Sequence, residues 1–187
     1  MATTQEIKKG LTIDYNNDLY TIIDFQHVKP GKGGAFIRTK LKSINSGKII
    51  EQTFNSGATI LPVRVERRPY QFLYKDESGY SFMDKNTFEQ VTLNDDMIDN
   101  PEFLKEGQEV EITFHAENDL PLSCELPDFV NLTITYAEPG LKGDTANSPL
   151  KPATLETGAI IKVPLFVNEG ELVKVDTRNK SYVERVK

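Results

Sequence analysis

In the segment Lys29-Pro30-Gly31-Lys32-Gly33-Gly34, Lys32 is flanked by glycines. This composition suits a lysine that acts at some distance from the protein body. Pro30 has a fixed φ angle, and the three glycines accept backbone angles that are closed to other residues. This composition predicts a thin loop that presents Lys32 without a bulky neighbour. Its ammonium can then enter a narrow cavity lined by phosphates, and a modifying enzyme can reach and extend it. The plain alternative is a flexible turn whose lysine serves only solubility.

Two segments that flank this loop have the composition of strands. Residues 19–25 and 35–41 are rich in β-branched and aromatic side chains, which favour a hairpin with the lysine at its tip. If the hairpin starts near Thr21, eight extended residues carry the tip roughly 26 Å from the body. A phosphate-binding P-loop is excluded, because Gly31 to Ala35 lack its spacing and its hydroxyl ligand for magnesium.

The rest of the chain is also strand-like, and its turns divide it into small units. Residues 1–64 contain Asn/Ser/Gly-rich turns at 16–18, 45–47 and 55–57 and about five short strands, which predict a small SH3-like barrel. Residues 65–127 resemble the five-stranded OB-fold, with one helix between strands. Its predicted strands are residues 71–75, 80–83, 88–92 and 110–114.

The predicted helix follows Asn100, which suits a cap, and begins at Pro101. Gly107 is expected just past its end. The third unit, residues 128–187, begins with a strand at 130–136 and continues with a loop that contains Pro139 and Pro152. Further strands are predicted at 160–163, 165–167, 172–175 and 182–183. This unit is compatible with the same fold as the second, so the sequence predicts an all-β chain of three small barrels in tandem.

Composition is that of a globular protein, with 38% hydrophobic and 27% charged residues in a chain of 187. No apolar run approaches the roughly 20 residues that a membrane-spanning helix needs, and the polar N-terminus does not resemble a secretory signal. Cys124 is the single cysteine, so an intramolecular disulfide is impossible. We therefore expect a cytoplasmic protein without a membrane partner.

The net charge of −6 is unevenly distributed. Residues 1–65 hold nine Lys/Arg against five Asp/Glu, residues 66–127 hold five against fifteen, and residues 128–187 hold eight of each. Such polarity lets a basic end approach phosphates while an acidic part limits non-specific adhesion. The alternative is that the charge difference between the domains has no functional cause and reflects only unconstrained variation of surface residues.

Enzyme chemistry finds little support in the sequence. His27 and His115 are the two histidines and have no partner at metal-ligand spacing, while Cys124 has no visible activating base. The acidic residues Asp95 and Asp96 lack the twelve-residue loop of a calcium site. We expect no metal, no cofactor and no catalytic residue.

Several separated motifs nevertheless resemble one family, elongation factor P. The loop at 28–36 is similar to that family's modification loop, and further matching motifs cover nearly the whole chain. They are Gly143-Asp144-Thr145, Lys151-Pro152-Ala153, Glu156-Thr157-Gly158-Ala159, Val163-Pro164-Leu165-Phe166-Val167, Glu169-Gly170, Val175-Asp176-Thr177-Arg178 and Tyr182-Val183-Glu184-Arg185.

The resemblance implies a KOW-type SH3-like barrel followed by two OB domains, together shaped like a tRNA and related to the hypusine-containing factor of eukaryotes and archaea. It implies a monomeric translation factor that binds ribosomal RNA and proteins between the peptidyl-tRNA and exit sites. There it relieves stalling at consecutive prolines. Lys32 would be modified by an enzyme and reach the CCA end of the peptidyl-tRNA, with Lys29, Pro30, Gly31, Gly33 and Gly34 forming its loop.

The resemblance also assigns residues near the C-terminus. Gly143, Asp144 and Thr145 would face the exit-site codon, and Tyr182 and Arg185 would contact tRNA. Simpler interpretations stay open: an ordinary turn, a half-buried strand tyrosine and a solvated surface charge. Two other functions also stay open, an elongation-factor-P-like paralogue with a different role in translation and a generic β-barrel module that binds proteins or single-stranded RNA.

Overall fold

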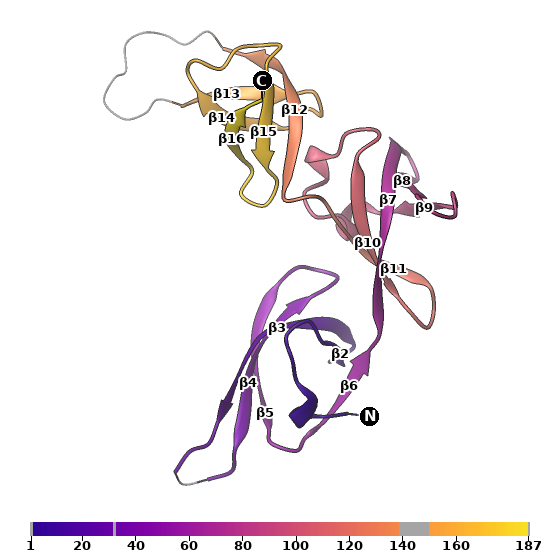
Figure 1. Ribbon diagram of the computed structural model, residues 1–187, viewed down its shortest axis with the longest axis vertical. Helices are drawn as coiled ribbons and strands as arrows, with labels where there is room; N and C mark the ends of the chain where they lie inside the picture. Colours follow the sequence, from indigo (N-terminus) through magenta and orange to yellow (C-terminus); the bar gives the residue numbers. More distant parts are fainter. Residues whose placement is uncertain (1, 32, 139–149, 187) are drawn as a thin grey trace. The chain divides into compact units, whose positions relative to one another are not determined.

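The described chain is built almost entirely of β-strands (Figure 1). The computed structural model describes residues 2–31, 33–138 and 150–186. Within these ranges the strands form three sheets, and the helical segments are short 3-10 turns. The predicted all-β class is confirmed.

The first sheet has the strand order β1-β6-β2-β3-β4-β5. Alternate side chains of its strands point to one face and form a core that includes Ile13, Ile22, Ile37 and Leu41, each at most 1% exposed. Its elements are β1 (Ala2–Thr3), η1 (Thr4–Glu6), β2 (Thr12–Tyr15), β3 (Asp18–Val28), β4 (Phe36–Ser43), β5 (Ile49–Asn55) and β6 (Thr59–Val63).

The second and third sheets share one topology. Their orders, β11-β10-β7-β8-β9 and β14-β13-β12-β15-β16, both place the first strand at the centre between the second and the fourth. This agrees with the prediction that both units have the OB-type fold. The strands are β7 (Val65–Asp76), β8 (Gly79–Asp84), β9 (Gln90–Leu93), β10 (Glu109–His115), β11 (Leu120–Glu125), β12 (Phe129–Ala137), β13 (Leu150–Leu155), β14 (Ile160–Pro164), β15 (Leu172–Asp176) and β16 (Ser181–Arg185).

By compactness the chain divides into two units, Met1–Arg68 with Ile112–Cys124, and Pro69–Glu111 with Glu125–Lys187. The domain boundaries expected from the sequence, at 64/65 and 127/128, stay a prediction.

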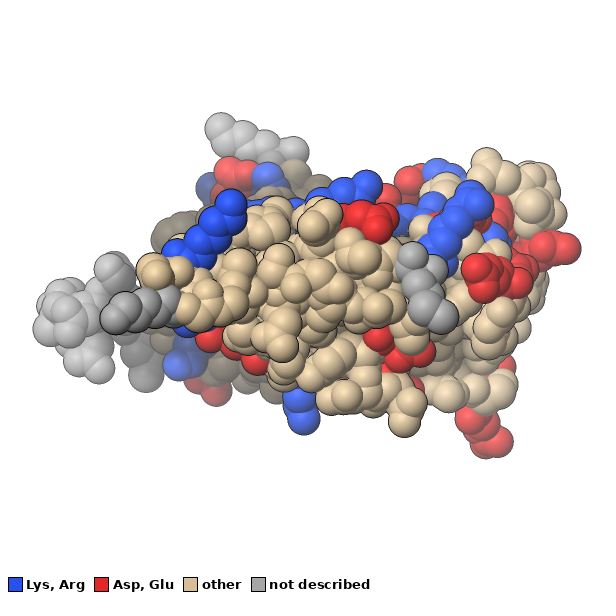
Figure 2. Space-filling model, turned by 90° about the horizontal axis from the view of Figure 1, so that it is seen from below, with Lys and Arg blue, Asp and Glu red and all other residues tan. Residues whose placement is uncertain are grey.

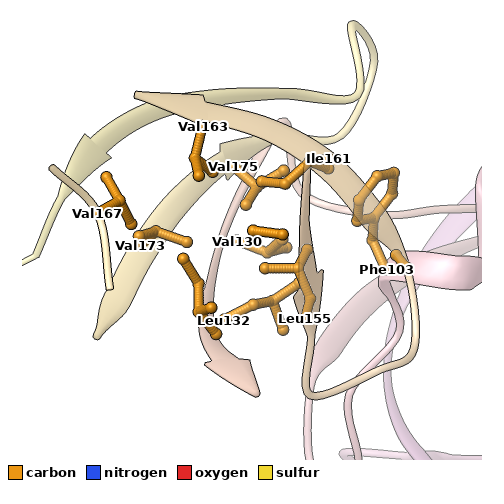
Figure 3. Packing of buried hydrophobic residues seen from close by; sticks show 12 residues of the cluster. Phe103, Val130, Leu132, Leu155, Ile161, Val163, Val167, Val173 and Val175 are labelled. Atoms are coloured by element: carbon orange, nitrogen blue, oxygen red, sulfur yellow. The ribbon is translucent and has the colours of Figure 1, made fainter. Parts of the chain in front are cut away.

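In the compact unit formed by Pro69–Glu111 and Glu125–Lys187, the core of the β12–β16 sheet includes a side chain from outside that sheet. Phe103, 1% exposed, belongs to the same buried cluster as Val130, Leu155 and Ile161, and Figure 3 shows it at one end of this cluster. Two ion pairs accompany it, Lys105 to Glu156 at 3.0 Å and Lys180 to Glu102 at 2.6 Å. The segment around Phe103 is thus part of the C-terminal core.

The predicted helix after Asn100 is wrong. The chain forms only the 3-10 turn η3 (Pro101–Phe103), because Asn100 adopts a left-handed conformation (φ 55°, ψ 56°) and makes no side-chain cap. Phe103, the last residue of the turn, and Leu104, the residue after it, are both buried.

One predicted strand and one predicted loop residue also differ from the structure. Residues 165–167 form a turn, not a strand, although Val167 is fully buried. Pro152, expected in a loop, lies in β13 opposite Lys162. Its missing N–H is tolerated because the pairing of β13 with β12 ends at Ala153.

Candidate functional site

The lysine loop connects β3 and β4, whose last pair is Val28 with Phe36. Lys29, Pro30, Gly31, Gly33 and Gly34 are all exposed, and Lys32 itself lies outside the described residues. Gly33 has φ +109°, which side-chain-bearing residues rarely adopt. No heavy atom lies within 4 Å of a Cβ placed on Gly31 or Gly34, so the described part of the loop is uncrowded.

The hairpin that carries the loop is supported by a third strand. β4 pairs with β3 on one side and with β5 on the other, up to Phe36 opposite Asn55, and the amide of Ser56 donates to the carbonyl of Ala35 at 2.9 Å. Ile37 is 1% exposed and belongs to the core. The pairing of β3 with β2 ends at Thr21, where the sequence placed the start of the hairpin, but β5 accompanies β4 from there up to Phe36. Of the described residues, 29–31 and 33–35 lie beyond the last pair of the hairpin, at the lower left of Figure 1.

A row of basic residues follows the outward face of β4. Arg38, Lys40 and Lys42 alternate with the inward residues Ile37, Thr39 and Leu41. Lys40 lies between Asp24 and Glu51 on the adjacent strands, whereas Arg38 lies between Gln26 and Thr53. Within the described ranges Arg38 forms no ion pair, so its guanidinium is free to meet a phosphate near the loop.

Asp24, the acidic neighbour of Lys40, already has a partner. Lys9 lies 2.9 Å from its carboxylate, and the resulting hydrogen bond and charge lower the pKa of Asp24. His27 lies on the other face of β3, where its ring packs edge-on against Phe25 at 5.5 Å between centroids. His27 therefore does not share the outward face with Arg38.

Charge on the face seen in Figure 2 lies mostly toward its edges. Uncharged side chains occupy much of the middle of that view, and Lys and Arg are interspersed with Asp and Glu along its upper edge. No broad basic patch is seen on the face drawn in Figure 2.

The two tail residues singled out in the sequence both lie on β16. Tyr182 is half-buried and packs against the C-terminal core, and Arg185 is exposed and pairs with Glu171 at 3.0 Å. The amide of Asn168, and then Arg185, hold the pKa of Glu171 below its ordinary value. Gly143, Asp144 and Thr145 lie outside the described residues.

Other motifs of the C-terminal sheet are engaged in hydrogen bonds that build it. The carboxylate of Asp176 accepts from the amides of Arg178 and Asn179 at 3.0 and 3.1 Å, which closes the turn before β16. The hydroxyl of Thr177 donates to the carbonyl of Pro127 at 2.8 Å. Glu156 accepts from the amide of Thr133 at 2.8 Å. These residues hold the fold together.

Sequence reasoning missed Arg38, although its period-two spacing with Lys40 and Lys42 was a usable signal. Among the residues that the structure describes, no group of three or more His, Cys, Asp or Glu is arranged to hold a metal ion. Nor does any helix in that part of the chain have the length and hydropathy to cross a membrane.

Comparison with known proteins gives matches along nearly the whole chain. Three family models match in order: the elongation factor P KOW-like domain at residues 3–60, the elongation factor P OB domain at 65–123, and the elongation factor P C-terminal domain at 130–185. Elongation factor P of Amoebophilus asiaticus is 62% identical, covering 100% of this chain and 98% of its own. Elongation factor P 1 of Porphyromonas gingivalis is 55% identical over the full length of both.

A solved structure is also similar over part of the chain. Eukaryotic translation initiation factor 5A from Methanococcus jannaschii is 24% identical with a TM-score of 0.47, and the match covers 66% of this chain and 94% of that one.

Proposed function

Because the chain belongs to the elongation factor P family of translation factors, we propose that it binds the ribosome between the peptidyl-tRNA and exit sites and relieves stalling at consecutive prolines. Its ligands there are ribosomal RNA and proteins and the peptidyl-tRNA, and it works as a monomer in the cytoplasm. The observation that carries this proposal is the open space around Gly31 and Gly34, in a loop at the end of a three-stranded ladder.

The proposed action of the loop is positioning. Proline's ring restricts the approach of the reacting groups during peptide-bond formation. Lys32, at the tip of the loop, steadies the CCA end of the peptidyl-tRNA, so the barrier falls by an entropic contribution. No side chain of this protein exchanges protons with the reactants, and neither a metal nor a cofactor takes part.

The rigid ladder supports this proposal. β4 is hydrogen bonded on both sides up to Phe36, so the base of the loop has a fixed direction. Arg38, on the outward face two residues from that base, is available for an RNA phosphate. We further propose that an enzyme extends Lys32 covalently, because the exposed glycines leave room for its active site.

The C-terminal sheet supplies the remaining proposed contacts. Gly143, Asp144 and Thr145 face the exit-site codon, where short side chains and backbone amides permit a close approach to RNA. Arg185 grips phosphate by exchanging its bond to Glu171 for one to the tRNA. Tyr182, half-buried, contacts the tRNA with the edge that it leaves exposed.

The test is reconstituted translation of a Pro-Pro-Pro message with protein purified from its native host. We expect wild type to raise the yield of full-length product and Lys32→Ala to abolish the increase while its circular dichroism stays unchanged. Lys48→Ala is the matched control, because Lys48 is exposed in the turn at the far end of the same ladder.

Each outcome has a separate meaning. A folded Lys32→Ala variant with full activity would refute the tip-lysine mechanism. An inactive wild type would refute relief of proline stalling and favour a paralogous role in translation. An unmodified mass for the native peptide that contains Lys32 would contradict the covalent extension.

A further inference from the structure

The first sheet carries a pocket of about 290 Å³. It lies where β6 changes neighbours, since Ile60 pairs with β1 and Leu61 pairs with Asp14 of β2. Its lining comes from residues 13–17, 54 and 59–61, none of which belongs to the lysine loop or to the motifs given RNA contacts above. The pocket is therefore a separate candidate site.

Part of the pocket wall is aromatic. The ring of Tyr15 packs edge-on against Phe54 at 5.6 Å between centroids and against Tyr20 at 6.1 Å. All three rings are half-buried and pack against the core of the sheet, which fixes their positions. Leu61, also in the lining, is 50% exposed. A stiff apolar ligand can cover this surface without first ordering the protein.

Polar groups beside this wall have no partner in the part of the chain that the structure describes. The hydroxyl of Tyr15 and the side-chain amides of Asn16 and Asn17 make no hydrogen bond there. Asn16 and Asn17 are exposed and have φ angles of 54° and 61°, as the tight turn from β2 to β3 requires. Hydroxyl and amide groups donate to carbonyl oxygens, so a fitting ligand offers carbonyls that are not already hydrogen bonded.

Charge in the pocket favours a cation. Of the described residues that line it, Asp14 alone is charged. Asp14 is exposed and forms no ion pair within the described ranges. An RNA strand would bring its phosphates to a carboxylate without any lysine or arginine in the lining to bind them. A basic side chain is complementary to the pocket instead.

We propose that this pocket binds a proline-rich segment of another protein that carries a lysine or arginine beside its prolines. Such a segment forms a polyproline II helix, which has no internal hydrogen bonds, so its carbonyls are free to accept from Tyr15, Asn16 and Asn17. Its proline rings lie against the aromatic wall, as in other aromatic-lined grooves, and its basic side chain reaches Asp14. Because this helix is preformed, binding costs little conformational entropy. The site is additional to the proposed ribosome contacts.

The test is fluorescence anisotropy with the full-length protein and a labelled octaproline peptide that ends in arginine. We expect saturable binding, whereas a glycine–serine peptide of the same length and charge should not bind. Leu61→Lys should weaken binding at least about tenfold, because it places a charge on the apolar surface and repels the arginine of the peptide.

Ile49→Lys is the matched control for this variant. Ile49 is 59% exposed in β5 of the same sheet and does not line the pocket, so its replacement should leave the affinity as in wild type. Absence of saturable binding, or an equal loss in the two lysine variants, would overturn the proposal.

Two conservative variants test the polar contacts while they keep the packing. Tyr15→Phe removes only the hydroxyl and should weaken binding about three- to tenfold. Asp14→Asn should weaken binding of the arginine peptide about two- to fivefold and leave an octaproline peptide that ends in glutamine unaffected. If both variants bind as tightly as wild type, the proposed recognition is wrong.

Other occupants would give other results. A labelled oligouridylate that binds wild type and is lost in Tyr15→Phe would make single-stranded RNA the ligand. A dimer detected by sedimentation and disrupted in Leu61→Lys would make a second copy of this chain the occupant. Either result would overturn the proposal. Neither involves the Pro-Pro-Pro assay, so the proposed function stands or fails independently.

Discussion

The lysine loop and the C-terminal sheet both carry motifs of the same family, but the motif residues are exposed in the loop and hydrogen bonded in the sheet. Along the loop, Lys29, Pro30, Gly31, Gly33 and Gly34 are exposed, and Gly31 and Gly34 have open space around them. In the C-terminal sheet, Glu156, Asp176 and Thr177 are held in hydrogen bonds that build the fold. A family motif can therefore mark a contact with a partner in one region and a structural bond in the other.

The largest effect that tests this comparison is on stability. Phe103→Ala should lower the free energy of unfolding by about 3–5 kcal/mol, because it opens a cavity in the C-terminal core. Gly34→Ala in the loop should change it by less than about 0.5 kcal/mol, because the added methyl group meets open space. Urea unfolding measures both.

Phe166→Ala is the control for aromatic loss in the same unit, since Phe166 is 61% exposed. If Phe103→Ala unfolds no more easily than Phe166→Ala, Phe103 is not part of the C-terminal core and the contrast between the two regions weakens.

A smaller loss of folding stability is expected when the pH is lowered. Burial raises the pKa of Glu156, but the amide of Thr133 and the ammonium of Lys105 outweigh it, so the pKa lies below its ordinary value. A lowered pKa contributes stability that is complete above the unfolded value and is lost as pH falls through the folded one. The denaturation midpoint should therefore fall as pH drops below about 4, and less steeply in Glu156→Gln.

Glu169→Gln serves as the control for this pH series, because Glu169 is exposed and no hydrogen bond or ion pair involves it within the described part of the chain. Identical pH profiles for wild type and Glu156→Gln would show that Glu156 does not act as a structural carboxylate.

The smallest effect concerns the face beside the loop. Arg38→Gln should raise the concentration of the protein needed for half-maximal product about three- to tenfold. It should also reduce the slope of log binding constant against log salt concentration by about the amount that one phosphate contact contributes. Stability should not change. Lys48→Gln, at the other end of the ladder, should leave both quantities as in wild type. An unchanged salt dependence in Arg38→Gln would remove this face from the proposed interface.

Strands were predictable from the sequence where their side chains alternate between a core and water. The segments 19–25, 130–136 and 172–175 all lie within strands of the structure. The absence of a helix after Asn100 was not predictable, since Asn100, Pro101 and Gly107 are residues typical of the ends of a real helix. What overrides them is the burial of Phe103 in the core of a different sheet.

The candidate site was predictable in part. Loop composition indicated an exposed lysine tip, and the described residues on both sides of Lys32 are exposed. The sequence did not reveal that β5 supports the hairpin, because strand pairing depends on register between distant segments.

The third strand beside the hairpin has a consequence for substrate recognition. An isolated peptide of residues 18–43 would contain β3, the loop and β4 but would lack β5, and a two-stranded hairpin alone is marginally stable in water. Any enzyme that acts on Lys32 therefore meets a loop whose base is held by three strands only on the folded domain. We expect its specificity constant for that domain to exceed its value for the excised peptide.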